Sequence, residues 1–323
     1  MRLLLAALAL AAAAPAAAQA PTARPAVASP TAPARADDSD GRCGVYVDGF
    51  ERGLAAFQAR AYDVARAAWT EVADVRGCGP DVAYNLATLA VLAGDLSAAA
   101  PAFTGALDRL DEWPADARAL DGSRELRRLA LGGLLAIGVR HYDAGRFGDA
   151  LAAFDTLAAR DSLHRDAAYN RALTLARLAP TAATAATRGA ARAHADALGG
   201  AARRALAFDP LSAALHALVA RADLAAGRAR AARRAHDRAE SLPVDVRGVR
   251  FDAETGEGAI ELLGRTAPAG TPLRFEVTLL RPEGPAETLV VRTSAPARGA
   301  RLDVPVRFET RIGATGLRYR LLD

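Results

Sequence analysis

Histidine, cysteine and closely spaced carboxylates are the side chains of this sequence whose chemistry suits catalysis or metal binding. The chain lacks an HExxH zinc motif, a GxSxG nucleophile elbow and a GxxxxGK[ST] phosphate loop, and it contains no lysine to complete the last of these. The five histidines are scattered over His141, His164, His194, His216 and His236. Packing explains His141 and His236 better than ligation. We therefore predict a protein that is not an enzyme.

The acidic residues likewise do not predict a catalytic site. Asp111 and Glu112 are adjacent, but their surroundings are polar, without the apolar setting that tunes a catalytic acid or base. Residues 37–41, DDSDG, suggest a calcium loop, yet Ala36 takes the first ligand position and the closing glutamate is absent. A solvated linker is the better interpretation, so we expect no metal and no cofactor.

The first twenty residues have the pattern of a secretory signal peptide. Arg2 supplies a positive start, residues 3–14 are apolar, Pro15 ends the run, and Ala18 and Ala20 are the small residues that a signal peptidase needs. A membrane anchor would require about 18 uninterrupted apolar residues. We predict cleavage before Pro21, no membrane span in the mature chain, and an exported protein, periplasmic or extracellular. The Pro- and Ala-rich residues 21–44 are predicted to be a disordered linker.

Cys43 and Cys78 are the only thiols of the chain. Outside the cytoplasm an even cysteine count favours one disulfide over a metal site, and neither residue stands in a CxxC motif. We predict a Cys43–Cys78 disulfide, with a reactive thiol as the alternative.

A repeated sequence pattern predicts the helices that position the side chains considered above. A small residue is followed twelve positions later by alanine and four positions after that by a bulky residue, and the first two copies are offset by 34 residues. Turns fall between, at Arg60-Ala61, Gly94-Asp95, Gly145-Arg146 and Gly227-Arg228. This spacing predicts pairs of antiparallel helices that cross closely where small side chains meet. The copies are Gly53, Ala65 and Trp69; Ala87, Ala99 and Phe103; Gly138, Ala150 and Phe154; and Ala220, Ala232 and His236.

These residues resemble tetratricopeptide repeats (TPR). The match is closest at residues 83–87, AYNLA, followed by Gly94-Asp95-Leu96, Ala99 and Phe103, and the AYN opening recurs at residues 168–170. Both asparagines of the chain, Asn85 and Asn170, occupy this motif. The resemblance implies an α-solenoid of helix pairs over residues 45–242. The segment Asp108–Arg127 is an insertion that we expect to form an extra helix or a long loop. The first helix pair then lies between Cys43 and Cys78, which would bring the two cysteines together.

After Pro243 alanine thins out, and valine, threonine and leucine alternate with charged residues. Short alternating runs separated by Gly- and Pro-containing turns are typical of an antiparallel sandwich. We predict a small all-β, sandwich-like domain over residues 243–323, with strands at 244–250, 259–265, 273–280, 288–293, 301–308 and 317–322.

The resemblance also implies a binding surface, because the first helices of successive tetratricopeptide repeats line a concave groove that receives a peptide or a partner helix. The groove residues carried over to this sequence are Tyr84, Asn85, Thr88, Tyr142, Tyr169, Asn170 and Arg177. The asparagines can hydrogen-bond a peptide backbone while the tyrosines supply contact area. For Tyr84 and Tyr169, packing between neighbouring repeats is an equal alternative.

Two functions follow from these patterns. The leading hypothesis is a non-enzymatic, extracytoplasmic TPR scaffold that binds a protein or peptide partner in the cell envelope. The alternative is an accessory module that binds an anionic envelope polymer through a cationic patch. The same arginines could instead form an ordinary solvated helix face. A formal net charge of +4 is too small for a dedicated nucleic-acid binder. The patch consists of Arg230, Arg233, Arg234 and Arg238.

Overall fold

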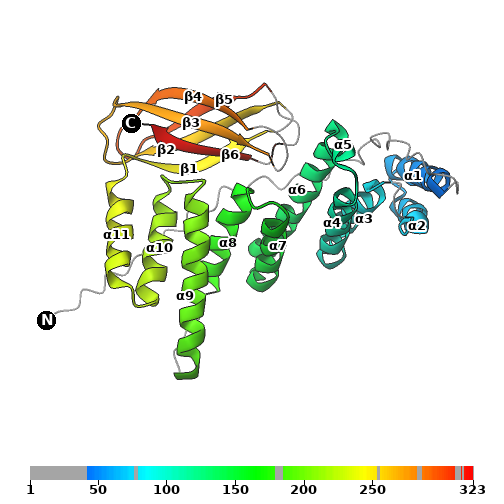
Figure 1. Ribbon diagram of the computed structural model, residues 1–323, viewed down its shortest axis with the longest axis horizontal. Helices are drawn as coiled ribbons and strands as arrows, with labels where there is room; N and C mark the ends of the chain where they lie inside the picture. The colour runs from blue at the N-terminus through cyan, green and yellow to red at the C-terminus, as the bar shows by residue number, and fades with distance from the viewer. Residues whose placement is uncertain are drawn as a thin grey trace.

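The computed structural model describes residues 42–75, 79–178, 185–252, 255–281, 286–309, 314 and 316–322. A helical part comes first in the chain and a β part follows it (Figure 1). The predicted signal peptide, the linker up to residue 41 and Cys78 lie outside the described residues. Within these ranges the helices are α1 (Arg42–Gln58), α2 (Tyr62–Val72), α3 (Asp81–Leu92), α4 (Leu96–Asp111), α5 (Ala115–Arg118), α6 (Asp121–Asp143), α7 (Phe147–Arg160), α8 (Arg165–Arg177), α9 (Ala185–Leu206), α10 (Ala213–Ala225) and α11 (Ala229–Ser241).

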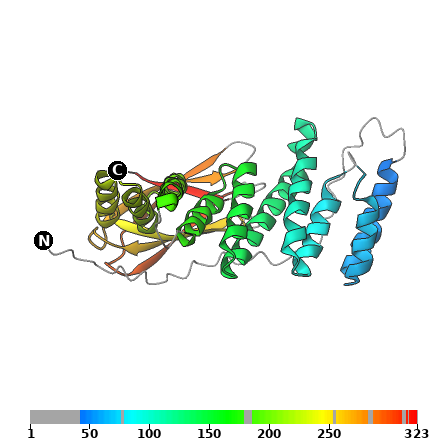
Figure 2. The same cartoon turned by 90° about the horizontal axis from the view of Figure 1, so that it is seen from below.

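Successive helices pack as antiparallel pairs: α1 with α2, α3 with α4, α6 with α7, α8 with α9, and α10 with α11. The pairs stand in a row, from the blue α1 at one end to the green helices beside the sheets (Figure 2). Within the row, α3 contacts α6, α6 contacts α8, and α8 contacts α10, so the first helices of neighbouring pairs adjoin one another. This is the arrangement of a TPR-like α-solenoid, and it confirms the predicted fold class.

The predicted turns are also confirmed where the structure describes them. Gly94, Gly145 and Gly227 have φ values of 77°, 72° and 80°, in the left-handed region that glycine adopts without a steric penalty. Arg60 takes the same role in the first pair with φ 60°. After Gly94, the Asp95 carboxylate accepts a hydrogen bond from the Ala98 backbone N–H at 3.0 Å and caps α4.

Small residues meet bulky ones where the paired helices cross. A Cβ added to Gly53 would overlap the Trp69 indole, and one added to Gly138 would overlap the Phe154 ring. Both rings are fully buried. The last copy departs from this pattern, because His236 is exposed on α11. The prediction that His236 packs inside the repeat is therefore wrong.

The insertion forms helix rather than loop. It contributes the short α5 and the first turns of α6, and Trp113 joins a core cluster with Leu126 and Leu131 of α6. Arg127 pairs with Asp111, and Arg160 of α7 reaches Asp108 at 2.5 Å. The inserted segment thus packs on both neighbouring helix pairs.

The C-terminal part is a pair of three-stranded antiparallel sheets with strand orders β1-β2-β5 and β4-β3-β6. Their inner faces share one core cluster that includes Ile260, Phe275 and Tyr319. Each predicted strand is confirmed to within two residues at either end. The strands are β1 (Val244–Phe251), β2 (Glu257–Gly264), β3 (Pro272–Leu280), β4 (Glu287–Ser294), β5 (Arg301–Arg307) and β6 (Gly316–Leu322).

The two parts share their apolar cores. Leu211 and Leu242 of the helical part belong to the β-part cluster, and Leu280 of β3 belongs to the cluster around α8, α9 and α10. Among the described residues, no helix has the length and apolar character to cross a membrane.

Two adjacent glycines of α6 test the crossing geometry. A Cβ on Gly133 would overlap the Phe103 ring, whereas one on Gly132 would meet nothing within 4 Å. We expect Gly132→Ala to raise the free energy of unfolding by up to about 1 kcal/mol through helix propensity. Gly133→Ala should lower it by about 1 to 3 kcal/mol, because overpacking outweighs the same gain. Denaturant unfolding of both variants measures the difference, and equal effects would contradict the proposed crossing.

Candidate functional site

The predicted groove residues of α3 are interior residues. Tyr84, Asn85 and Thr88 are 6%, 1% and 4% exposed. The Tyr84 ring packs against Phe103 of α4 at a centroid distance of 5.6 Å, and the Thr88 hydroxyl donates to the Tyr84 carbonyl oxygen at 3.0 Å. For Tyr84 the packing alternative is therefore correct, and none of the three presents its side chain to a partner.

Tyr142 and Arg177 lie together at the surface. They come from α6 and α8, and the Arg177 Nε donates to the Tyr142 hydroxyl at 3.1 Å. Tyr142 is held edge-on against Phe147 at a centroid distance of 5.3 Å. Arg177 is exposed and Tyr142 is half-buried. The remaining guanidinium N–H groups and the accessible edge of the tyrosine can meet a ligand.

Tyr169 and Asn170 lie in the first half of α8, about two turns from Arg177, and are both half-buried. Burial raises the pKa of Tyr169, and the nearby Asp209 carboxylate raises it further. The phenol is consequently neutral at physiological pH and available as a hydrogen-bond donor. The structure thus leaves four groove residues with exposed surface: Tyr142, Tyr169, Asn170 and Arg177.

A buried ion pair fixes the start of α8. The Arg165 guanidinium holds Asp209, in the turn before α10, through Nη2–Oδ2 at 2.7 Å and Nε–Oδ1 at 3.2 Å. It also contacts Asp166 at 2.7 Å. Burial lowers the pKa of Arg165, but the two carboxylates more than offset this and keep its pKa raised above the usual value. The arginine is therefore always charged, and Asp209 is its buried partner.

The region around the Arg165–Asp209 ion pair also joins the helices to the sheets. Burial, together with Asp209, raises the pKa of Tyr319 on β6 well above its usual value. The Asp245 carboxylate of β1 accepts a hydrogen bond from the Ala213 N–H at 2.9 Å and so caps α10. We call Arg165, Asp209, Tyr319 and Asp245 the junction cluster. The sequence did not single these residues out, because a buried arginine or aspartate has no spacing that distinguishes it from a solvated one.

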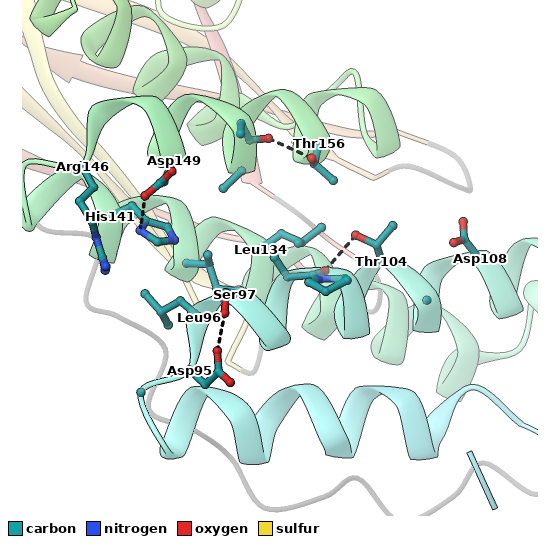
Figure 3. Close-up of a pocket in the computed structure, with 17 residues that line it drawn as sticks. Asp95, Leu96, Ser97, Thr104, Asp108, Leu134, His141, Arg146, Asp149 and Thr156 are labelled. Carbon is teal, nitrogen blue, oxygen red and sulfur yellow. Dashed lines mark hydrogen bonds and ion pairs between the residues drawn. The ribbon is translucent and has the colours of Figure 1, made fainter. Parts of the chain in front are cut away.

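A pocket of about 830 Å³ is lined by residues of α4, α6 and α7, among them Leu134 and Ile137 of α6. Figure 3 shows this pocket. His141 Nδ1 lies 3.8 Å from an Asp149 carboxylate oxygen at one end. Burial lowers the pKa of His141, Arg146 lowers it further and Asp149 opposes both. The imidazole is thus neutral at pH 7, which agrees with a packing role.

The polar groups of this pocket do not form a catalytic arrangement among themselves. The Ser97 hydroxyl donates to Asp95 at 2.6 Å, so it is bonded to the helix-capping aspartate and not to His141 (Figure 3). The hydroxyls of Thr104 and Thr156 donate to backbone carbonyl oxygens of their own helices. Across the described part of the chain, no group of three or more His, Cys, Asp or Glu side chains could hold a metal ion.

The arginines of the predicted anion patch are all exposed on α11: Arg230, Arg233, Arg234 and Arg238. Within the part of the chain that the structure describes, none of them has a salt-bridge partner. Arg228, at the start of the same helix, contrasts with them because it pairs with Asp196 at 2.5 Å and Asp223 at 2.8 Å.

The structure describes only one of the two cysteines of the predicted disulfide. Cys43 lies in the first turn of α1, while Cys78 falls outside the described residues. One turn after Cys43, the Tyr46 hydroxyl accepts a hydrogen bond from the Val82 N–H at 3.2 Å. The start of α1 therefore lies next to the start of α3, close in sequence to Cys78. The pairing of the two cysteines stays a prediction.

No protein-family model matches the sequence, and no curated protein matches it. Solved structures similar to the chain include MamA of AMB-1, at 17% identity and a TM-score of 0.34, covering 61% of this chain and 90% of MamA. MamA of MSR-1 is 16% identical with a TM-score of 0.31, covering 63% of this chain and 97% of its own. A thermophilic TPR protein of Thermus thermophilus is 16% identical with a TM-score of 0.24, covering 61% and 90%. These scores are low, and the TPR-like fold rests on the packing of the helices themselves.

Asp209 and Asp166 offer a matched test of the junction, because both contact Arg165 while only Asp209 is buried. Asp209→Ala should lower the free energy of unfolding by about 3 to 5 kcal/mol, since it leaves a buried guanidinium without its main partner. Asp166→Ala should cost under about 1 kcal/mol, as is usual for pairs in contact with solvent. Chemical denaturation followed by circular dichroism measures both. Comparable losses in the two variants would refute the central role of Asp209.

Proposed function

We propose that this protein is a non-enzymatic scaffold that binds a protein segment along the inner helices α6 and α8. The observation that carries the proposal is the surface pair of Tyr142 and Arg177, joined at 3.1 Å across these two helices. An exposed arginine whose fork is oriented by a tyrosine is suited to a carboxylate or a backbone carbonyl. Aromatic and arginine side chains also dominate the energetics of protein interfaces.

The ligand that fits best is an extended peptide segment with an acidic group. Arg177 would take the carboxylate, while the half-buried Asn170, about two helical turns away on α8, would bond the peptide backbone. Tyr169 lies at the end of this surface that is next to the junction cluster.

The proposed setting is the cell envelope. Residues 1–20 have the pattern of a cleaved signal peptide, and Cys43 and Cys78 would form a disulfide in an oxidising compartment. The partner would accordingly be another exported or membrane-anchored protein of the envelope.

Tyr142→Ala combined with Arg177→Ala tests this surface. Loss of the two side chains should weaken partner capture by about 1 to 3 kcal/mol, because each hydrogen bond contributes about 0.5 to 1.5 kcal/mol. Quantitative mass spectrometry of proteins captured from an envelope extract gives the readout. The matched control is Tyr62→Ala with Arg66→Ala on α2, where Tyr62 also packs on a phenylalanine, Phe57, at 5.5 Å. Equal capture by the two double variants would show that Tyr142 and Arg177 do not bind the partner.

The second candidate function is binding of an anionic envelope polymer by α11. The observation in its favour is that the patch arginines are exposed and lack salt-bridge partners among the described residues. Arg230, Arg233 and Arg234 lie on one face of the helix by their spacing, although Asp237 shares that face. The guanidinium fork matches phosphate and carboxylate groups alike.

Arg230→Glu with Arg234→Glu should abolish retention on heparin resin, a model polyanion. Retention of the unaltered protein should fall as salt is added, because the Debye length is about 8 Å at physiological ionic strength. Arg188→Glu with Arg192→Glu on α9 is the control, with the same spacing, exposure and charge change. Retention that survives the α11 reversal, or that ignores salt, would eliminate the polymer function and leave the scaffold.

A further inference from the structure

Three of the four sheet edges in the β part are blocked or covered. At the β1 edge the Val246 N–H donates to the Leu211 carbonyl oxygen at 3.1 Å, and the strand has an irregularity in register between Val246 and Gly248. β5 has Pro305 at its centre, which removes a backbone donor. β6 packs against α8 and β1. Proteins use such devices to prevent pairing with another strand.

The edge of β4 lacks these devices. β4 pairs with β3 in unbroken register from Pro272↔Ser294 to Leu279↔Glu287, and it contains neither proline nor glycine. Its second edge has no strand partner among the described residues. The strand runs along the side of the β part that faces away from the helices (Figure 1). A long, regular edge of this kind is a template for one more strand.

Exposed apolar surface marks the same strand. Val290, at its centre, is 52% exposed and is the only large hydrophobic residue with high exposure in the described β part. On the other face, Leu289 and Val291 are half-buried and pack against the β core. A strand added beside β4 would place its side chains alongside this apolar centre on both faces of the sheet.

We propose that the added strand is β4 of a second copy of this protein, paired antiparallel about a two-fold axis at Val290. In this register Val290 faces Val290 of the partner subunit on the outer face. Leu289 faces Val291 of the partner subunit on the inner face, so the apolar core continues across the interface. Arg292 faces Thr288 of the partner subunit, and Glu287 faces Thr293 of the partner subunit. No like charges stand opposite each other.

The neighbouring two-fold registers are worse. Centring the axis on Leu289 sets the Glu287 carboxylate opposite Val291, and centring it on Val291 sets Arg292 opposite Val290. Registers in which the numbers of two facing residues add up to an odd sum are excluded, because they would place an inner-face residue opposite an outer-face one. The sequence of β4 is thus self-complementary in one register, which is the reason for choosing a second copy over an unrelated strand.

Charge reversal at the axis tests the proposal. The purified protein should show twice the monomer mass by light scattering coupled to gel filtration. Val290→Lys and Val290→Glu should each weaken dimerisation by about tenfold or more, since like charges directly opposite in a strand pair are destabilising. Mixing the two variants should restore the dimer, because lysine then faces glutamate. Mild oxidation of the Val290→Cys variant should give a covalent dimer that the unaltered chain does not form.

Val64→Lys on α2 is the matched control, because Val64 is similarly exposed and lies far from the sheets in sequence. Circular dichroism checks that every variant is folded. A monomeric unaltered protein would overturn the proposal, and so would a dimer that Val290→Lys and Val290→Glu leave intact. These outcomes are independent of the groove, since partner capture by Tyr142 and Arg177 is measured separately.

Discussion

The buried ion pair between Arg165 and Asp209 is the constraint on which the rest of the structure depends. Removing both charges from water is costly, so the pair is stable only while the guanidinium keeps its two bonds to the buried Asp209 carboxylate. The contact with the more exposed Asp166 adds little. Those bonds hold the first turn of α8 against the turn that precedes α10, beside Tyr319 of β6. The position of α8 in turn sets where Tyr169, Asn170 and Arg177 lie. The C-terminal end of the candidate groove is therefore defined by an electrostatic contact between three segments distant in sequence, and not by the repeat pattern.

Much of the fold could be predicted because its determinants are local. Gly53 and Gly138 occur where Trp69 and Phe154 need space, and the spacing of sixteen residues within each couple leads from the first helix of a pair to the facing position on the second. The turns at Gly94, Gly145 and Gly227 need a positive φ that glycine supplies. The six strands were found from their alternation and from the turns between them. In each case the residues that specify the element lie within it, so a single sequence is enough.

The site was harder to predict because burial depends on neighbours that the repeat period does not specify. Tyr84 and Asn85 have the motif spacing of groove residues, yet Tyr84 shares a core cluster with Trp113 and Leu126, which belong to the insertion. Asn85 is buried, and among the described residues neither of its amide atoms has a hydrogen-bond partner, an uncommon and costly state for a side chain that the motif assigns to ligand binding. His236 shows the opposite case, since it has the spacing of a core ring and is exposed on the last helix. A pattern locates a helix face, and only the packing of the next element decides whether that face is interior or surface.

The junction cluster and the β4 edge together determine what a dimer could do. The ion pair and the Asp245 cap fix the sheets to the last two helix pairs, so pairing through β4 would carry two solenoids on one continuous sheet. Each solenoid keeps its own surface at Tyr142 and Arg177, because β4 lies on the far side of the sheets from the helices (Figure 1). A partner with two copies of the recognised segment would then bind the second surface at the effective concentration set by the first, provided that its segments can span the distance. Weak individual contacts, of the size expected for one arginine, one tyrosine and one asparagine, would suffice for stable capture. The rigidity of the junction would matter more to such a scaffold than the affinity of either groove alone.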